Sequence, residues 1–534
     1  RLATARADGG NSGAIDGPAP LGRAPVTGSA AVAIRAPLLW GRRGGLTAGC
    51  QIELAPGLTK SCLAAVDAST LTVQARWSPP GQDLNLATAL VDDADRIIVT
   101  TQQRHLFVVS RPDSDGGQFR VLRDIDLNGH LADGQGLLAS VVDGSGNLWF
   151  ASGGAPPSGE APLGEAPPLR GAATNTVVGY VTSDDQVVTT TLADQRAETT
   201  LAVDQRDVYL ATSPAGSADK AGARGAVYDF TSATGQIETV WRESYDAGSA
   251  AKPGATTRGT GAPVVLLGGQ YLAVTDNADG QSHLLIYLRG ALAAEGAHGA
   301  SGSTTSTALG AAAPGTNPAS STTGPAQSGP LPTGPTSTGA STTTPAAGTQ
   351  SGTGTAGDPR LVCSVALFSP GASAITSAPI GYSSGDSPSD VNSVIVVNGY
   401  DAPPPLTSPS DGGPANNINQ MAPGVARIDV LSDGSGCQTE WTVPLRIKAG
   451  PVLSTATGLV YGYTQDEARA AAGSYVWYFV AIDYRNGRVV WHQRTGAGST
   501  KNDNRQPTVL GANGVLYQTL PLGLVWMRDV AQRP

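Results

Sequence analysis

Short apolar runs alternate with turn residues along most of the chain, and two phrases recur. In the first, an apolar strand ends in Asp, a turn follows and a Trp closes the next strand, as in Ala65–Trp77, Val227–Trp241, Arg427–Trp441 and Ala481–Trp491. In the second, an Asp-led turn joins two apolar runs, as in Val91–Val99, Val142–Phe150 and Val203–Leu210. Hairpins repeated at roughly 50-residue spacing are typical of a β-propeller, because a four-stranded blade cannot bury both of its faces alone. The pattern predicts an all-β fold, a closed β-propeller of four-stranded blades.

Grouping the predicted strands in fours gives eight blades, with seven as the alternative. The last group shows only three strands, so we expect an N-terminal strand over Ala31–Ile34 to supply the fourth and to close the ring. Residues 1–30, which are mostly small and polar, are expected to be a flexible segment beside that closing strand. The blades are expected at about 36–77, 87–126, 138–192, 199–243, 262–367, 377–443, 451–492 and 507–528.

One long stretch has a composition unlike the rest of the chain. From Gly296 to Gly357 there is no Asp, Glu, Lys or Arg and no aromatic residue. Such a segment cannot bury enough apolar surface to offset its chain entropy, so we expect residues 296–357 to be a disordered insertion, with Ser and Thr open to O-linked sugars. It divides the predicted propeller into a first part, 31–295, and a second part, 358–534.

The order of strands within a blade predicts that one face of the ring is elaborated. If strands A to D are antiparallel, B–C loops and D–A connections lie on one face, and A–B and C–D loops lie on the other. Loops held by a rigid scaffold commonly carry function, so we expect any recognition to use the B–C face. The long B–C loops are expected at Gly153–Ala173, Ser213–Arg224, Asp401–Gly424 and Thr464–Ser474.

Charge and composition narrow the partner classes. The net charge of −9 and the pI near 5.1 argue against nucleic acid, because phosphate binding needs clustered Lys and Arg. No apolar run reaches the length of a membrane-spanning helix, so none is expected.

The cysteines and the start of the chain suggest an exported protein. Four cysteines without C-x-x-C spacing favour the disulfides Cys50–Cys62 and Cys363–Cys437 in an oxidising compartment, with four buried free thiols as the alternative. The chain opens at Arg1 with no apolar signal core, which is typical of a processed, secreted or cell-envelope protein.

The first phrase resembles the repeat of quinoprotein-type, PQQ-like propellers, which reads Ala-Leu-Asp, two residues, Thr-Gly, a spacer and Trp. Ala481–Trp491 carries this resemblance most fully. Asp143–Trp149 is similar instead to lactonase and streptogramin-lyase propellers, and about Gly424–Asp529 resembles uncharacterised secreted propeller proteins of high-GC bacteria. Quinoprotein dehydrogenases typically carry adjacent cysteines, and this chain has no Cys-Cys pair. We therefore expect four of its Trp residues to pack between blades as structural residues: Trp77, Trp241, Trp441 and Trp491.

A candidate metal site follows the second predicted blade. Oxygen ligands Asp124, Asp126 and Asn128 fall at positions one, three and five of a calcium loop, with Gly129 at six. Gln135 stands where a bidentate Glu belongs, and Asp133 falls one place late. The alternative is a strand that ends in a turn at Asn128. Calcium is the one cofactor that the sequence suggests, and we expect the shorter Asp113–Gly116 stretch to be a plain turn.

Two further patterns bear on catalysis. Gly381–Gly385 matches G-x-S-x-G, but no helical pattern follows it, so we expect a hairpin loop instead of a nucleophile turn. The five histidines lack metal-ligand spacing, although a ring could still assemble one at its centre from different blades: His105, His130, His283, His298 and His492.

The sequence therefore favours a secreted or cell-envelope scaffold or recognition module without catalytic residues. Its B–C face would meet a protein or glycan partner. The competing hypothesis is a propeller enzyme with a site at the central channel, either a quinone-dependent dehydrogenase or a lyase or hydrolase of lactone type. A third hypothesis is a structural component of an envelope assembly.

Overall fold

The computed structural model describes residues 8–56, 58–112, 117–132, 134–154, 174–205, 207–255, 257–290, 358–387, 390–406, 408 and 413–530. All of them belong to one compact unit formed by residues 1–290 and 349–534. The predicted insertion at 296–357 lies outside the described residues.

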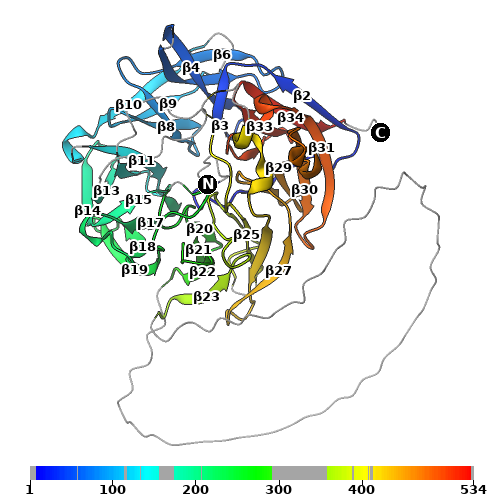
Figure 1. The fold of residues 1–534 in the computed structure, drawn as a ribbon. Helices are drawn as coiled ribbons and strands as arrows, with labels where there is room; N and C mark the ends of the chain where they lie inside the picture. The colour runs from blue at the N-terminus through cyan, green and yellow to red at the C-terminus, as the bar shows by residue number, and fades with distance from the viewer. Residues whose placement is uncertain are drawn as a thin grey trace, which may run out of the picture. The chain divides into compact units, whose positions relative to one another are not determined.

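The described strands form eight sheets around a ring, which confirms the predicted eight-bladed propeller (Figure 1). Blades 1–4 comprise β3 (Ile34–Trp40), β4 (Leu46–Ala55), β5 (Leu58–Val66) and β6 (Val73–Trp77); β7 (Leu84–Val91), β8 (Arg96–Thr101), β9 (His105–Ser110) and β10 (Arg120–Asp126); β11 (Gln135–Val142), β12 (Leu148–Gly154), β13 (Asn175–Val181) and β14 (Val187–Ala193); and β15 (Gln195–Ala197), β16 (Ala202–Asp204), β17 (Asp207–Pro214), β18 (Arg224–Thr231) and β19 (Glu238–Asp246).

Blades 5–8 complete the ring. The first strand of a blade lies near the ring centre and the fourth at the rim, as Figure 1 shows for β20 and β23. These blades comprise β20 (Val265–Leu267), β21 (Tyr271–Thr275), β22 (His283–Leu288) and β23 (Leu361–Ala366); β24 (Ile380–Ser383), β25 (Asn392–Val397), β26 (Val425–Val430) and β27 (Cys437–Val443); β28 (Val452–Ser454), β29 (Leu459–Gln465), β30 (Val476–Asp483) and β31 (Val489–Ala497); and β32 (Thr508–Leu510), β33 (Leu516–Leu520), β34 (Gly523–Asp529) and β2 (Pro25–Ala30).

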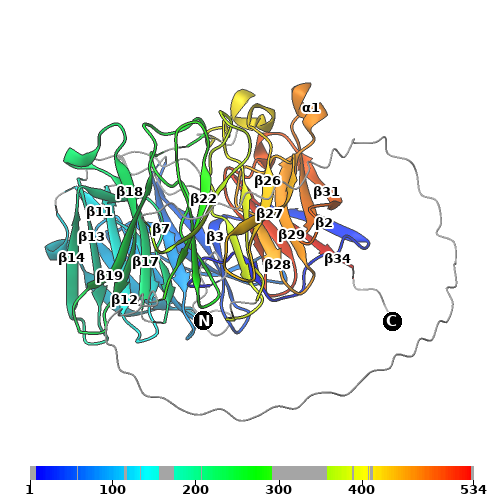
Figure 2. The same ribbon diagram turned by 90° about the horizontal axis from the view of Figure 1, so that it is seen from below.

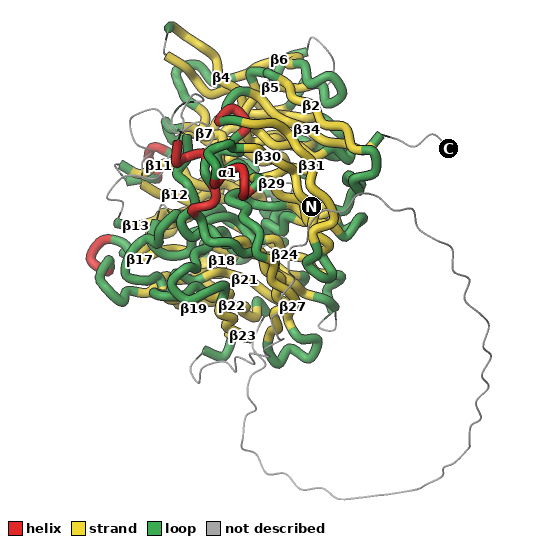
Figure 3. The backbone as a smooth tube through the Cα atoms, turned by 45° about the vertical axis from the view of Figure 1, so that its right-hand side comes forward, coloured by secondary structure: helices red, strands yellow, loops and turns green. Residues whose placement is uncertain are grey.

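Helices contribute little to the described fold. Figure 3 shows them as short red segments in the loops: α1 (Glu467–Ala471) and the 3-10 turns η1 (Asn128–His130), η2 (Gly216–Ala218), η3 (Gly413–Asn416), η4 (Ile418–Gln420) and η5 (Ser499–Lys501). None of the described helices has the length and apolar character needed to cross a membrane.

An N-terminal strand closes the ring, as predicted, but that strand is β2 and not Ala31–Ile34. β2 pairs with β34 from Pro25↔Asp529 to Ala30↔Leu524. Ile34 instead begins β3 and pairs with Cys50 in blade 1, where it is buried. The prediction was wrong because it sought an apolar run, whereas a strand at the rim can be small and polar. A Cβ added at Gly28 would lie 2.3 Å from the Trp526 ring, so a small residue is required there.

The segment before β2, residues 8–24, is called the strap below. The sequence places it in a flexible segment, but the chain binds it at many points. The buried Asn11 donates from Nδ2 to Leu201 O and Val264 O, both at 3.1 Å, and so joins blades 4 and 5. β1 (Ala14–Ile15) then adds in parallel to β28 of blade 7. These bonds come from backbone and amide groups that no hydrophobicity pattern reveals.

Each repeat Trp lies at a seam where its blade meets the next part of the ring. Trp441 Nε1 donates to Tyr484 O of blade 7 at 2.8 Å. Its ring also packs on Gly487, whose φ of 72° and missing Cβ allow this approach. Trp77 packs edge-on against Phe107 of blade 2, with ring centroids 5.5 Å apart. Trp241 and Trp491 lie against blade 5 and the strap respectively.

Both predicted disulfides are present. Cys50–Cys62 joins directly opposite residues of β4 and β5. Cys363–Cys437 joins β23 of blade 5 to β27 of blade 6, so it is a covalent link across a seam. All four cysteines are buried.

The Asp of the second repeated phrase shapes the hairpin between the first two strands of a blade. The Oδ1 atom of buried Asp143 accepts hydrogen bonds from Ser145 N and Asn147 N, at 2.8 and 3.0 Å. Its Oδ2 atom accepts one from Trp149 Nε1 at 2.9 Å. Side-chain acceptance of backbone N–H groups is the reason Asp is favoured in turns.

We expect Asp143→Ala to lower the free energy of unfolding by about 3 kcal/mol, because the substitution strands the Trp149 indole N–H and two turn N–H groups. Urea unfolding monitored by far-UV circular dichroism measures this change. Asp184→Ala, at an exposed turn of the same blade, is the control and should unfold near the wild-type midpoint. A wild-type midpoint for Asp143→Ala would contradict this role.

Candidate functional site

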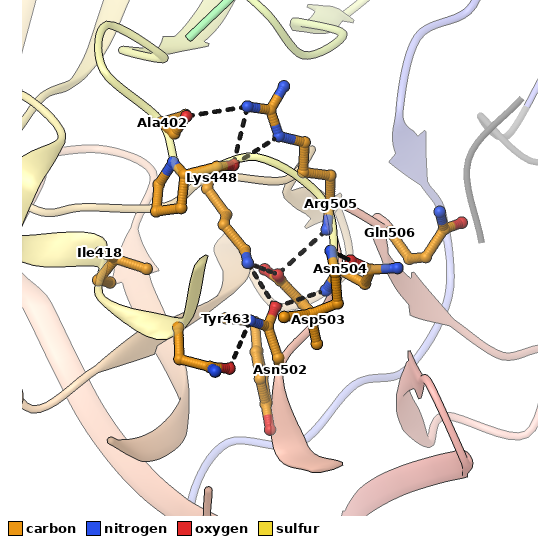
Figure 4. Close-up of polar contacts among 12 residues, drawn as sticks. Ala402, Ile418, Lys448, Tyr463, Asn502, Asp503, Asn504, Arg505 and Gln506 are labelled. Carbon is orange, nitrogen blue, oxygen red and sulfur yellow. Dashed lines mark hydrogen bonds and ion pairs between the residues drawn. The ribbon is translucent and has the colours of Figure 1, made fainter. Parts of the chain in front are cut away.

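A fully buried charge pair lies beneath the B–C face, the face formed by B–C loops and D–A connections. Lys448 comes from the connection between blades 6 and 7, and Asp503 from the connection between blades 7 and 8. Lys448 Nζ lies 2.9 Å from Asp503 Oδ1, and the side chains are 1% and 0% exposed (Figure 4). The ammonium group also donates to Asn502 Oδ1 and lies 5.3 Å from the centre of the Trp477 ring.

The chain around Asp503 forms a tight turn stabilised by its own side chains. Asn504 and Arg505 have φ values of 48° and 62°, in the left-handed region that Asn tolerates better than most residues. Asn504 N donates to Asn502 Oδ1 at 2.8 Å, and Arg505 N donates to Asp503 Oδ1 at 3.2 Å. The turn thus buries its polar side chains with most of their hydrogen bonds made.

This turn holds the long B–C loop of blade 6, residues 398–424. Asn502 Nδ2 donates to Ala415 O at 3.1 Å, and Leu406 N donates to Asn504 Oδ1 at 2.6 Å. The Arg505 guanidinium binds two carbonyl oxygens of the same loop, Ala402 O and Pro403 O (Figure 4). The loop of blade 6 is therefore fixed by the connection between blades 7 and 8.

Blade 7 adds a further tie to the same loop. At the end of β29, Gln465 accepts from Ile418 N at 3.2 Å and donates to Asn416 O at 2.6 Å. Arg446 Nη1 reaches Glu467 at the start of α1, at 2.7 Å. Figure 2 shows α1 and the loop before β26 projecting on one face of the ring. Exposed residues of the blade 6 and blade 7 B–C loops include Asp401, Gln420 and Ala468.

Burying the Lys448–Asp503 pair carries a large desolvation free energy. Removing two charges from water costs several kcal/mol per ion, and the attraction between them offsets this only where geometry and hydrogen bonds are good. Asp503 Oδ2 has no hydrogen-bond partner among the described residues. Such a pair adds little net stability, but it permits one arrangement of the loops, because any other leaves a charge buried and unpaired.

A second polar cluster ties the loops over blades 4 and 5. Buried Glu198 accepts from Arg196 Nε at 2.9 Å and from Ser213 Oγ at 2.9 Å. Burial raises the pKa of Glu198, and its hydrogen bonds and the Arg196 charge oppose that rise. Arg258 donates to Gly248 O and pairs with Asp219, so it joins the loop after β17 to the loop after β19.

Catalytic residue types also meet on this face, at blade 5. His283 Nδ1 lies 2.9 Å from Asp276 Oδ2, and this hydrogen bond raises the pKa of His283. Lys252 Nζ donates to Ser282 Oγ at 2.8 Å, and burial lowers the pKa of Lys252. A serine nucleophile is activated by an adjacent base that accepts its proton, which Lys252 can do only in its neutral form. Ser282 is 0% exposed, however, so its hydroxyl is not presented to a substrate in this structure.

In the structure, the described residues of the predicted calcium loop are hydrogen-bonded to protein groups. Asp124 Oδ1 lies 2.6 Å from His105 Nδ1, while Asp126 Oδ1 accepts from Asn128 N at 2.9 Å and Nδ2 at 2.7 Å. The Asn128 bonds lower the pKa of Asp126. Asp133 and Asp113–Gly116 lie outside the described residues. In the described part of the chain, no three His, Cys, Asp or Glu side chains are grouped as metal ligands. Calcium binding stays a prediction.

The G-x-S-x-G match lies where the hairpin interpretation places it. Ser383 ends β24, which pairs directly with β25. Its hydroxyl contacts Gly385 O at 2.6 Å and Asn392 Oδ1 at 2.7 Å, within the same hairpin.

One buried carboxyl group lies at the seam between blades 4 and 5, near the A–B face. Burial, aided by the nearby Asp207, raises the pKa of Asp229 to about 8, while Arg289 opposes the rise. Asp229 is 2% exposed, and its Oδ1 has no hydrogen-bond partner among the described residues. Arg289 is itself held by Asp204, at 2.7 Å.

Sequence reasoning missed the Lys448 cluster completely. Lys448 is one of only five lysines in the chain, and four polar residues run together from Asn502 to Arg505. Both signals were present, but neither distinguishes an exposed turn from a buried one.

No family model and no curated protein matches this chain. Solved structures similar to it include Sqt1 from Chaetomium thermophilum bound to the N-terminus of ribosomal protein L10, at 12% identity and a TM-score of 0.43, covering 91% of this chain and 94% of that one. The WD40 domain of SCAP from fission yeast has 6% identity and a TM-score of 0.45, with 94% and 97% covered. A streptogramin B lyase has 9% identity and a TM-score of 0.35, with 94% and 97% covered. Likenesses this weak carry no function over to this chain.

We expect Lys448→Met to lower the free energy of unfolding by about 3–5 kcal/mol, because Asp503 would keep its charge without a counter-ion. The double variant Lys448→Met/Asp503→Leu should lose less than the single variant. Urea unfolding measures both changes. Arg469→Met is the control: its side chain is 61% exposed and lies 3.7 Å from Asp466, so we expect a change below about 0.5 kcal/mol. A single variant as stable as the wild type would refute the argument.

We expect Asp229→Asn to flatten the pH dependence of stability. A raised folded pKa means that the native state holds this proton more tightly than the unfolded chain does. Its contribution to stability is full below the ordinary pKa near 3.8 and is lost as pH rises toward 8. The variant should therefore gain about 4–5 kcal/mol over the wild type at pH 8 and less than about 1 kcal/mol at pH 4.

Thermal unfolding from pH 4 to pH 8 tests this expectation. Asp433→Asn is the control, because its hydrogen bonds to Ser435 lower the pKa of Asp433 and its titration lies below this range. Parallel curves for Asp229→Asn and the wild type would show that Asp229 titrates normally.

Proposed function

We propose that this chain is a secreted or cell-envelope recognition module that binds a protein or glycan partner through its B–C face. The observation that carries the proposal is the Lys448–Asp503 pair, which is 1% and 0% exposed and anchors the long loop of blade 6. Loop residues that are already held in place in the free protein, as the described residues of this loop are, lose less conformational entropy when a partner binds. The desolvation cost of burying two charges is consistent with a binding role, because the pair holds the loop in one conformation.

Two further features support this proposal. The described loop residues over blades 4–7 share one face, and they are tied to neighbouring segments by buried or half-buried polar side chains: Glu198, Arg258, Gln465 and Arg505. Two disulfides suit an oxidising compartment, as expected for an exported protein.

A hydrolase is the second candidate function, and the Lys252–Ser282 contact of 2.8 Å favours it. The adjacent His283–Asp276 pair could serve as an acid or base. This hypothesis requires a movement that exposes Ser282, so we rank it below recognition. A quinone-dependent reaction and calcium binding remain predictions from the sequence alone.

A peptide phage library and a glycan array provide the ligand for the test. We expect at least one of them to yield a ligand whose affinity falls tenfold or more, about 1.4 kcal/mol, in Gln420→Arg/Ala468→Arg. Both positions are exposed on the B–C face. Isothermal titration calorimetry measures the change.

The matched control places the same substitutions on the opposite face. Ala233→Arg/Gln236→Arg lies in the exposed hairpin between β18 and β19, and we expect its affinity to stay within twofold of the wild type. If the control variant lost affinity for the ligand, or the B–C variant kept it, recognition would use another part of the surface. Failure of both libraries to yield any ligand would count against the proposal as well.

A further inference from the structure

The strap binds the inner strands of four consecutive blades through backbone hydrogen bonds. Each first strand donates an N–H group to a successive strap carbonyl. Val203 N donates to Gly9 O at 2.8 Å in blade 4, and Leu266 N to Gly10 O at 2.9 Å in blade 5. Gly381 N of blade 6 donates to Ser12 O at 2.7 Å, and Leu453 N of blade 7 donates to Gly13 O at 3.0 Å.

These donors belong to a sheet edge that the blade itself leaves open. In an antiparallel pair, hydrogen-bonded residues alternate with residues whose N–H and C=O groups point away from the partner strand. The first strand of a blade has a partner on its rim side only, so every second N–H points toward the ring centre. The strap therefore crosses the inner edges of these blades near the A–B face, with one backbone bond to each of blades 4, 5 and 6 and a short parallel pairing with β28 of blade 7.

Blades 8, 1, 2 and 3 carry an equivalent donor. In each of them the residue after the first strand donates across the hairpin: Gly511 N to Val515 O, Gly41 N to Gly45 O, Asp92 N to Arg96 O and Asp143 N to Asn147 O, at 2.9–3.1 Å. By alternation, the preceding N–H points to the ring centre; these are Leu510, Trp40, Val91 and Val142. Among the described residues, none of these four groups donates outside its own sheet.

We propose that the inner edge of blades 8, 1, 2 and 3 binds an extended, glycine- and serine-rich peptide tail of a partner protein. The strap shows how such a tail would lie, because it occupies the equivalent edge of blades 4–7. Its contact residues are small, from Gly9 to Gly13. A Cβ at Gly10 would already lie 3.1 Å from Leu266 Cβ, so the edge selects for small side chains. Recognition comes from backbone carbonyls, which every extended peptide offers.

The test uses the full chain and a fluorescein-labelled peptide with the sequence of Asp8–Gly17. We expect saturable binding in fluorescence anisotropy at one peptide per chain. Val91→Pro/Val142→Pro should weaken binding at least tenfold, because proline has no N–H to donate. The sheet should persist, since neither N–H belongs to the ladder with the second strand.

The matched control is Val91→Ala/Val142→Ala, which trims the same buried side chains but keeps both N–H groups. Its affinity should stay within about threefold of the wild type. Absence of saturable binding to the wild type, or equal affinities for the two double variants, would overturn the proposal. The second outcome would mean that the peptide replaces the chain's own strap on blades 4–7.

Hydrogen–deuterium exchange on the wild type keeps the test independent of how well the proline variant folds. Added peptide should slow exchange at residues 89–92 and 140–143 and leave residues 201–204 unchanged. The reverse pattern would contradict the proposal. Because this edge is separate from the B–C face, its failure would leave the recognition proposal standing.

Discussion

The structure depends on one constraint: a four-stranded sheet with two apolar faces is stable only between two others like it. Every seam in the ring buries such faces, and a seam is most specific where a large side chain meets a small one, as Trp441 meets Gly487. The ring can only exist if the last seam closes, so β2 must leave the N-terminus of the chain and pair with β34. Closure covers the apolar faces of the last and first blades, while each blade keeps an inner and a rim edge strand.

Given a closed ring, the two faces and the centre serve different purposes. The described hairpins between the first two strands of a blade, on the A–B face, are closed by turn residues such as Asp143. The B–C face carries long loops, and long loops lose much entropy on ordering. Buried polar groups restrict them to one arrangement, since a displaced loop would leave Lys448 or Asp503 without its partner. The propeller supplies rigidity, and the polar clusters extend that rigidity to the loops.

Backbone hydrogen bonding at the ring centre explains why the strap is bound. A first strand satisfies its N–H groups on one side only, and Gly9–Gly13 is small enough to lie along the open side. Asn11 reaches two blades at once because its side chain is an amide, with two N–H groups to donate. Composition alone suggested flexibility for this segment, yet its small residues are what allow it to be bound.

The sequence by itself predicted most of the strands and turns, eight blades with seven as the alternative, and two disulfides with free thiols as the alternative. These depend on local alternation and on turn-forming residues such as Asp92 and Asp143, which act within a few positions of themselves. Cys363 and Cys437 could be paired because four cysteines leave few choices. Only the tertiary structure decided that β2 closes the ring, that the strap is bound and that Lys448 meets Asp503. Those contacts join segments far apart in the chain. They depend on the packing angles between neighbouring blades, which add up around the ring and which no local sequence pattern encodes.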